Sequence, residues 1–139
     1  MENAETADGG DVVATGRIVL LNRDLFFGVR IRQVGAAMCY VVEITPKTDL
    51  FIERVKSEDV VLGVIDIAAT PDWELLASAI ASGDLAPILA FGPHKDVDGL
   101  RSAKQAGVTR VVSNGDFHKD PGGLMQRYAR RTAENAPAS

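Results

Sequence analysis

The sequence predicts an α/β fold in which helices cover both faces of a parallel sheet, and three observations support this. The 139 residues are 46% hydrophobic, which is enough for the core of one ordinary domain. Five short apolar runs recur along the chain, as is typical of strands buried on both faces. Segments with apolar side chains at helical spacing separate these runs. This alternation predicts consecutive βαβ units, and hence a parallel sheet.

The expected strands are rich in Val, Ile and Leu, and the third, "VVLGVID", is the most buried in character. They are residues 17–21, 40–44, 60–66, 86–91 and 109–113. Crossovers between parallel strands are right-handed, which leaves few arrangements for five such units at this size. We therefore expect a flavodoxin-like, doubly wound five-stranded parallel sheet of order 2-1-3-4-5.

Capping residues and glycines predict where the helices begin and end. Asp24 is the expected N-cap of a first helix that runs to about Met38. Two later helices are expected to start at Thr45 and Thr70, each followed by a proline whose missing N–H costs nothing in a first turn. The third and fourth helices are expected to stop at glycine. The helical segments are 24–38, 45–57, 70–83, 96–107 and 121–131.

The two ends of the chain lack this pattern. Residues 1–15 are rich in Glu, Asp, Gly and Ala without a sustained period, and we expect a disordered N-terminal tail there. Residues 132–139 are expected to form a disordered C-terminal tail on the same grounds. The domain itself is expected to span residues 16–131.

Charge and composition exclude several classes of protein. The net charge of −4 argues against binding to nucleic acid or to an anionic membrane. No apolar run reaches membrane-spanning length, and the acidic N-terminus is unlike a signal peptide. The single cysteine, Cys39, excludes an internal disulfide and is expected to act as a small buried hydrophobe. We therefore expect a cytoplasmic domain.

Polar residues follow the apolar runs where ligands bind in such sheets. In the expected strand order, the crevice lies beyond the carboxyl ends of the first and third strands. The side chains at the strand ends are those of Asn22, Arg23, Asp24, Asp66, Gly92 and Asn114. A carboxylate in this position suggests a metal or phosphate site, but the arginine beside it indicates a different kind of site.

Together these residues resemble the receiver domain of two-component response regulators, the CheY-like fold, over roughly residues 16–131. The opening "DLFFGVRIR" and the ending "FGPH…AGVTRVVSNGDF" are more specifically similar to a group of small stand-alone receiver-like proteins with no assigned chemistry. The resemblance implies a site in which an acidic pair after the first strand and the aspartate of the third hold magnesium. That aspartate accepts a phosphoryl group, a Thr or Ser after the fourth strand binds it, and a lysine after the fifth pairs with it.

Asp66 matches the phosphoryl acceptor, but the other positions depart from this pattern. The acidic pair falls on Asn22 and Arg23, with Asp24 as a third acid nearby. The hydroxyl position falls on Gly92, and the lysine position falls on Asn114. Magnesium requires several hard oxygen ligands, so Asp24 and Asp66 are at most weak metal candidates beside the fixed charge of Arg23.

We expect Arg23 to pair with Asp66 in place of the metal. No resident cofactor is expected, and magnesium would bind only if the site were active.

These departures predict a degenerate receiver: a non-enzymatic signalling or scaffold module that acts through protein–protein contacts. The expected partner is a signalling protein or kinase, or a second copy of the chain in a homodimer, and neither nucleic acid nor a membrane. In receivers the face formed by the fourth helix, fifth strand and fifth helix usually carries partners. In this chain it would present Arg101, Lys104, Arg110, Tyr128 and Arg130, mixed with Asp98 and Asp116.

Two alternatives remain open from the sequence. One is a phosphorylatable response regulator that uses Asp66. The other is a small flavodoxin-like enzyme or ligand-binding domain that uses Asp66, Asp24 and His94. An open polar pocket would favour that enzyme, and a closed Arg23–Asp66 pair would favour the scaffold.

Two further features are expected to be structural. His94 has no second His or Cys at ligand spacing, and His118 is expected to be similar but more exposed. The stretch "SNGDF" is expected to be a turn in which Asn-Gly supplies a positive φ.

Overall fold

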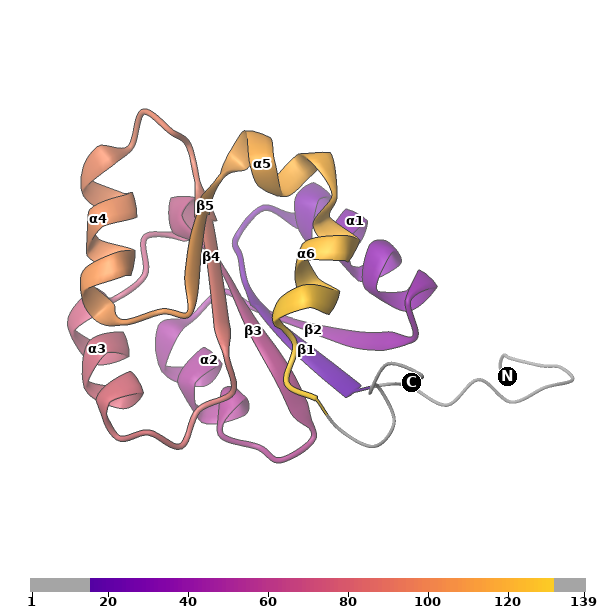
Figure 1. Ribbon diagram of the computed structural model, residues 1–139, viewed down its shortest axis with the longest axis horizontal. Coiled ribbons are helices and arrows are strands. Elements are labelled where there is room, and N and C mark those ends of the chain that lie inside the picture. The colour runs from indigo at the N-terminus through magenta and orange to yellow at the C-terminus, as the bar shows by residue number, and fades with distance from the viewer. Residues whose placement is uncertain (1–15, 132–139) are drawn as a thin grey trace, which may run out of the picture.

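The computed structural model describes residues 16–131, in which helices cover both faces of a five-stranded sheet (Figure 1). The strands are β1 (Gly16–Leu21), β2 (Tyr40–Thr45), β3 (Val60–Asp66), β4 (Ile88–Gly92) and β5 (Arg110–Ser113). All neighbouring strands are parallel, and their order is β2-β1-β3-β4-β5. The predicted fold and strand order are confirmed. The two predicted tails lie outside the described residues.

The helices divide between the two faces of the sheet (Figure 1). They are α1 (Leu25–Ala37), α2 (Thr48–Val55), α3 (Trp73–Ala81), α4 (Val97–Ala106), α5 (Asn114–Lys119) and α6 (Pro121–Tyr128), with a 3₁₀ turn, η1 (Ile67–Ala69), after β3. One core cluster contains side chains of α2, α3 and α4, and the other contains side chains of α1, α5 and α6. Within residues 16–131, no helix combines the length and apolar character needed to cross a bilayer.

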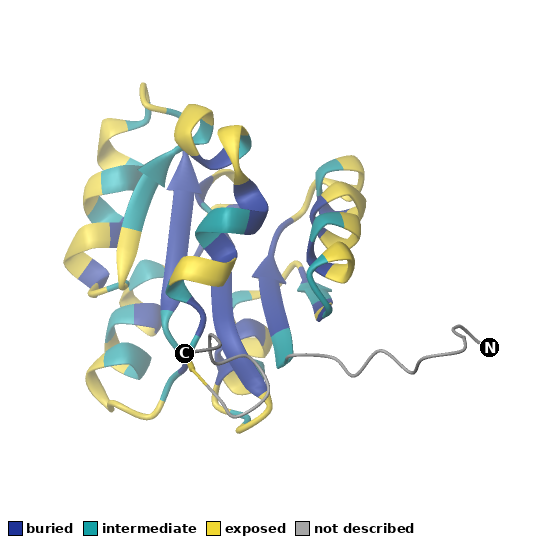
Figure 2. Ribbon diagram, turned by 45° about the vertical axis from the view of Figure 1, so that its right-hand side comes forward, coloured by how far each residue is buried: buried dark blue, intermediate teal, exposed yellow. Residues whose placement is uncertain are grey.

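Burial is greatest along the central strands (Figure 2). Six of the seven residues of β3 are buried, and only its last residue, Asp66, is partly exposed. A strand with a helical layer on each side has no face for polar side chains, which explains its continuous apolar composition. The first polar side chain of β3 is therefore Asp66, at its carboxyl end, and that end of the sheet carries the candidate site.

Two predicted helix starts were wrong. Thr45 ends β2, and its hydroxyl accepts the backbone N–H two residues later, so α2 starts only at Thr48. Thr70 follows η1 with φ +53°, and α3 starts at Trp73. The side chain of Asp72 caps α3 by accepting the N–H of its third residue at 3.0 Å. Each Thr-Pro pair thus lies before its helix rather than at its start, and at α3 the capping role falls to Asp72.

The predicted turn at "SNGDF" was also wrong, whereas the predicted last helix starts at Pro121 as expected and ends at Tyr128, three residues earlier than predicted. The hydroxyl of Ser113 accepts the N–H of Asp116 at 3.1 Å, and this N-cap starts α5 directly after β5. Asp120 then caps the separate helix α6. Helix α5 contacts both β4 and β5 and lies over their carboxyl ends (Figure 1). It therefore places Phe117 and His118 near the crevice.

Candidate functional site

The centre of the crevice is a contact between the ends of β1 and β3. Asn22, which follows β1, is only 2% exposed, and its Nδ2 donates to Oδ2 of Asp66 at 2.9 Å. The Oδ1 of Asn22 accepts the backbone N–H of Asp24 at 3.1 Å. Its own backbone N–H donates to the carbonyl of Thr45 at the end of β2. One buried residue, through its side-chain amide and its backbone N–H, therefore links three strand ends and the start of α1, which satisfies the polar groups that burial would otherwise penalise.

Asp66 is half-buried at the end of β3, and both of its carboxylate oxygens are engaged. Oδ2 accepts from Asn22, and Oδ1 accepts the N–H of Ala68 at 3.0 Å, which caps η1. Burial raises the pKa of Asp66 above the usual carboxyl value, and the charge of Asp24 acts in the same direction. The two N–H donors and the charge of His118 lower the same pKa but do not cancel the effect of burial. The carboxylate is thus held by neutral donors.

Arg23 does not form the ion pair predicted for it. Its side chain is exposed, and among the described residues no ion pair joins it to Asp66. It lines a groove on the outer side of α1 instead. Asn22 lines the same groove, but its amide also reaches Asp66, whereas Arg23 stays exposed.

Asp24 is committed to α1 rather than to the crevice. Its Oδ1 accepts the backbone N–H groups of Phe26 and Phe27 at 3.0 and 3.2 Å, as an N-cap does. The predicted capping role of Asp24 is confirmed. The same contacts weaken its candidacy as a metal ligand.

Gly92 ends β4, and its lack of a side chain follows from close packing. A Cβ at this position would lie 2.9 Å from the Cβ of Ile67 in η1, closer than real Cβ atoms approach. A serine or threonine here would therefore require Ile67 to move. The packing of the turn that follows Asp66 thus disfavours, at this position, the hydroxyl that the receiver pattern contains.

An aromatic cluster closes the crevice from the side of α1 and α5. The rings of Phe91 on β4 and Phe117 on α5 stack with centroids 4.2 Å apart and planes 7° apart. Phe27 of α1 contacts both rings, at 5.2 and 6.1 Å. The ring of His118 lies edge-on against Phe27 at 5.1 Å. Aromatic pairs in such geometries add stabilisation beyond their buried area, so α5 is held firmly over the strand ends.

His118 is the crevice residue that the sequence analysis missed. It is partly buried, whereas His94 is exposed in the loop after β4, so the predicted order of exposure was wrong. Asn114 lies one helical turn before His118 on α5. Within the described part of the chain, Oδ1 of Asn114 and Nδ1 of His118 are buried without a hydrogen-bond partner. Helical spacing could have paired these two residues, had the segment been predicted as a helix.

The residues at the crevice do not fit a magnesium ion. Residues 16–131 contain no group of three or more His, Cys, Asp or Glu side chains that could hold a metal. Magnesium requires near-octahedral oxygen ligands. Here the oxygens of Asp66 and the capping oxygen of Asp24 already accept N–H groups, and Asn22 presents an amide donor to Asp66. A metal would have to displace the bonds that hold the strand ends together.

The predicted partner face is brought together only in part. Arg101 and Lys104 on α4 and Arg110 at the start of β5 are exposed. Tyr128 is partly buried against the core beneath α6. The assignment of Arg130 to this face was wrong, because its backbone N–H and guanidinium donate to carbonyls at the amino end of β3.

No protein-family model matches the sequence, and no curated protein matches it. Solved structures do match it. The receiver domain of the TMAO respiratory system response regulator TorR superposes with a TM-score of 0.64 at 17% identity, covering 81% of this chain and 98% of that one. A response regulator receiver protein from Pseudoalteromonas atlantica gives 0.66 at 14% identity over 81% and 95%. The chemotaxis protein CheY4 from Vibrio cholerae gives 0.65 at 12% identity over 84% and 98%. The chain therefore has the CheY-like receiver-domain fold.

Proposed function

We propose that this chain is a degenerate receiver: a cytoplasmic, non-enzymatic signalling or scaffold module that acts through protein–protein contacts. The observation that carries the proposal is the state of Asp66. Both of its oxygens accept N–H groups, from Asn22 and from Ala68, and among residues 16–131 no ion pair involves its carboxylate. A carboxylate in that state is a structural cap more than a nucleophile.

Phosphoryl transfer depends on positioning and on neutralising charge, and the crevice offers little of either. Three positions that would supply these effects in the receiver pattern carry Asn22, Gly92 and Asn114. None of these side chains brings a positive charge, a hydroxyl group or a metal-binding carboxylate. At Gly92, the packing of Ile67 leaves no room for a hydroxyl. The aromatic cluster, meanwhile, covers the side of the crevice beneath α5.

The surfaces that remain for function are those of the helices. The face with Arg101, Lys104 and Arg110 is exposed, and Arg101 pairs with Asp98 at 3.3 Å on the same helix. Mixed charge of this kind contributes to partner choice more than to raw affinity. A signalling protein or kinase is the partner we propose for it, or a second copy of the chain.

The test is to incubate the full chain with acetyl phosphate and magnesium and to measure its intact mass. We expect no adduct, while a receiver that keeps the acidic pair, the hydroxyl and the lysine is modified under the same conditions. A stoichiometric phosphoryl adduct that disappears in Asp66→Asn would contradict the proposal and support a phosphorylatable response regulator.

A further inference from the structure

The first two turns of α1 expose large apolar side chains to solvent. Leu25 is 81% exposed, Phe26 is 91% exposed and Val29 is 48% exposed. Single exposed apolar residues are common, but a contiguous group rimmed by polar residues marks an interaction site. Val29 lies four positions after Leu25 and three after Phe26, so its side chain adjoins both on the helix surface.

A groove of about 400 Å³ runs beside this apolar group, between α1 and the end of β2. Leu25 and Val29 form one wall, and Ile44 and Pro46 lie opposite. The two elements approach closely at Gly28, where a Cβ would lie 2.9 Å from Cδ1 of Ile44. The surface is therefore concave and apolar rather than flat.

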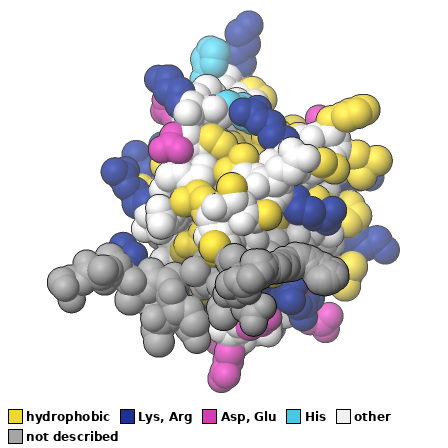
Figure 3. All heavy atoms as spheres, turned by 90° about the vertical axis from the view of Figure 1, so that its right-hand side faces the viewer, with side chains coloured by type: hydrophobic (Ala, Val, Ile, Leu, Met, Phe, Trp, Pro, Cys, Tyr) yellow, Lys and Arg dark blue, Asp and Glu magenta, His cyan; other side chains and the backbone are white. Residues whose placement is uncertain are grey.

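Two arginines, Arg23 and Arg32, line the groove, and neither forms an ion pair within residues 16–131. Helix α1 contains no acidic residue. In residues 16–131, every ion pair recorded involves other cations, and Arg32 donates only to the carbonyl of Val42, at 3.4 Å. Figure 3 shows basic and hydrophobic side chains side by side on this side of the molecule. The arginines thus make this face more basic than the protein as a whole, whose net charge is −4.

We propose that this α1 face, meaning Leu25, Phe26 and Val29 with the groove and its arginines, binds an acidic amphipathic helix of a partner protein. The apolar side of such a helix fills the groove, as in other helix-in-groove complexes. Its carboxylates meet the unpaired guanidinium groups, which steers association and sets orientation. The inference rests on the proposed function in one respect: it gives the scaffold a class of partner.

Other occupants fit the α1 face less well. A symmetric homodimer through this face would place the same patch on itself, arginine against arginine. An anionic membrane would attract the arginines and Phe26, but a concave groove matches a helix better than it matches a bilayer surface. The acidic residues 1–15 of this chain carry suitable charge, and the test below includes them.

The probe is a synthetic peptide of about 18 residues, or five helical turns, with Leu at i, i+3, i+4 and i+7 and Glu elsewhere. Binding to the full ¹⁵N-labelled chain is followed by amide shifts and by fluorescence anisotropy. We expect shifts on α1 and around the groove, and affinity that falls with added salt. Phe26→Ser, and separately Arg23→Glu, should each weaken binding by about tenfold. The matched controls Leu75→Ser and Arg127→Glu, exposed on α3 and α6, should leave it unchanged.

Several results would overturn the proposal. They are shifts confined to other elements, equal binding of a scrambled Leu/Glu peptide, and Phe26-dependent binding to phosphatidylglycerol vesicles without peptide binding. A change in the α1 shifts on deletion of residues 1–15, or a dimer that Phe26→Ser dissociates, would assign the face to another occupant. The acetyl phosphate experiment has a separate readout. If the phosphoryl adduct forms and the peptide still binds, only the proposed function is contradicted. If no adduct forms and the peptide does not bind, only the present inference is contradicted.

Discussion

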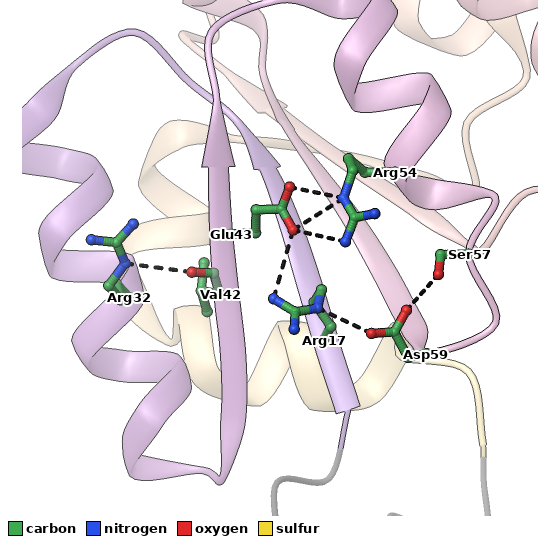
Figure 4. A network of polar contacts seen from close by, with 7 residues as sticks. All are labelled: Arg17, Arg32, Val42, Glu43, Arg54, Ser57 and Asp59. Carbon is green, nitrogen blue, oxygen red and sulfur yellow. Dashed lines mark hydrogen bonds and ion pairs between the residues drawn. The ribbon is translucent and has the colours of Figure 1, made fainter. Parts of the chain in front are cut away.

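The molecule carries two polar sites whose carboxylates are stabilised in opposite ways, by cations in one and by neutral donors in the other. The first is a charge network over β1, β2 and α2 (Figure 4). Glu43 accepts from Arg54 through Nε at 2.9 Å and Nη2 at 3.1 Å, and Arg17 lies 3.6 Å away. Arg17 also pairs with Asp59 at 3.1 Å, and the hydroxyl of Ser57 donates to Asp59 at 2.6 Å. Each carboxylate of this network therefore has a guanidinium partner.

The second site is the crevice, where Asp66 has only the amide of Asn22 and the N–H of Ala68. The pKa values follow this difference. The hydrogen bonds from Ser57 and Arg17 lower the pKa of Asp59, whereas burial raises the pKa of Asp66. In the crevice, Asp66 is held in place by hydrogen bonds, but no cation forms an ion pair with its carboxylate. The three predictions below test this difference, from the largest expected effect to the smallest.

The largest effect is expected from Asn22→Asp, which replaces the neutral donor by a second carboxylate. Two carboxylates at hydrogen-bond distance cannot both ionise without cost, so the variant should lose about 3 kcal/mol of stability at pH 7. This corresponds to a thermal midpoint lower by about 10 °C. Magnesium should then raise the midpoint of the variant, because the pair is now a set of metal ligands. Thermal unfolding with and without magnesium measures both effects.

The control for this prediction is Asn22→Leu, which removes the same hydrogen bonds without adding charge. It should also be destabilised, but magnesium should not restore it. A midpoint of the parent protein that rises with magnesium as much as that of Asn22→Asp would show that the crevice binds the ion unaided, against the comparison drawn above.

An intermediate effect is expected from Gly92→Thr, which adds the hydroxyl that the receiver pattern contains. Its Cβ would overlap Ile67, and overpacking of this kind costs about 1–3 kcal/mol. Combining it with Ile67→Gly, which also removes the Cβ that is overlapped, should relieve that overlap, and a double-mutant cycle of unfolding free energies measures the coupling. Gly115→Ser is the control, because a Cβ there would meet nothing closer than 3.9 Å. Equal stability of Gly92→Thr and the parent would remove the steric explanation.

The fold could be predicted from the sequence because it depends on a pattern of apolar residues that is visible in the sequence itself. Strands buried on both faces must be continuous apolar runs, and βα alternation with right-handed crossovers then restricts their order. The charge network was not predicted, because Arg17, Glu43 and Arg54 lie in separate elements and meet only through strand register and helix docking.

The location of the site residues was predicted correctly, but the contacts between them were not. Asp66, Asn22 and Gly92 lie at the predicted edge of the sheet, yet the partner of Asp66 was predicted one residue too far along the chain. Whether Asn22 or Arg23 turns inward depends on side-chain direction where the strand ends. His118 was missed because Asn-Gly signals a turn locally, whereas the hydroxyl of Ser113 caps a helix there.

The smallest effect is expected in the pH dependence of stability, where the two sites should have opposite signs. A carboxyl whose pKa is raised on folding opposes folding once it ionises, so Asp66 lowers stability as pH rises from the usual carboxyl value through its raised value. Asp59, whose pKa is lowered, contributes stability that is lost as pH falls toward that lowered value. Thermal midpoints of Asp66→Asn and Asp59→Asn, each relative to the parent, should be measured from about pH 3 to pH 7. The difference should move in favour of Asp66→Asn and against Asp59→Asn as pH rises. Two differences that change in the same direction would mean that a cation compensates Asp66 after all, and the contrast between the two sites would fail.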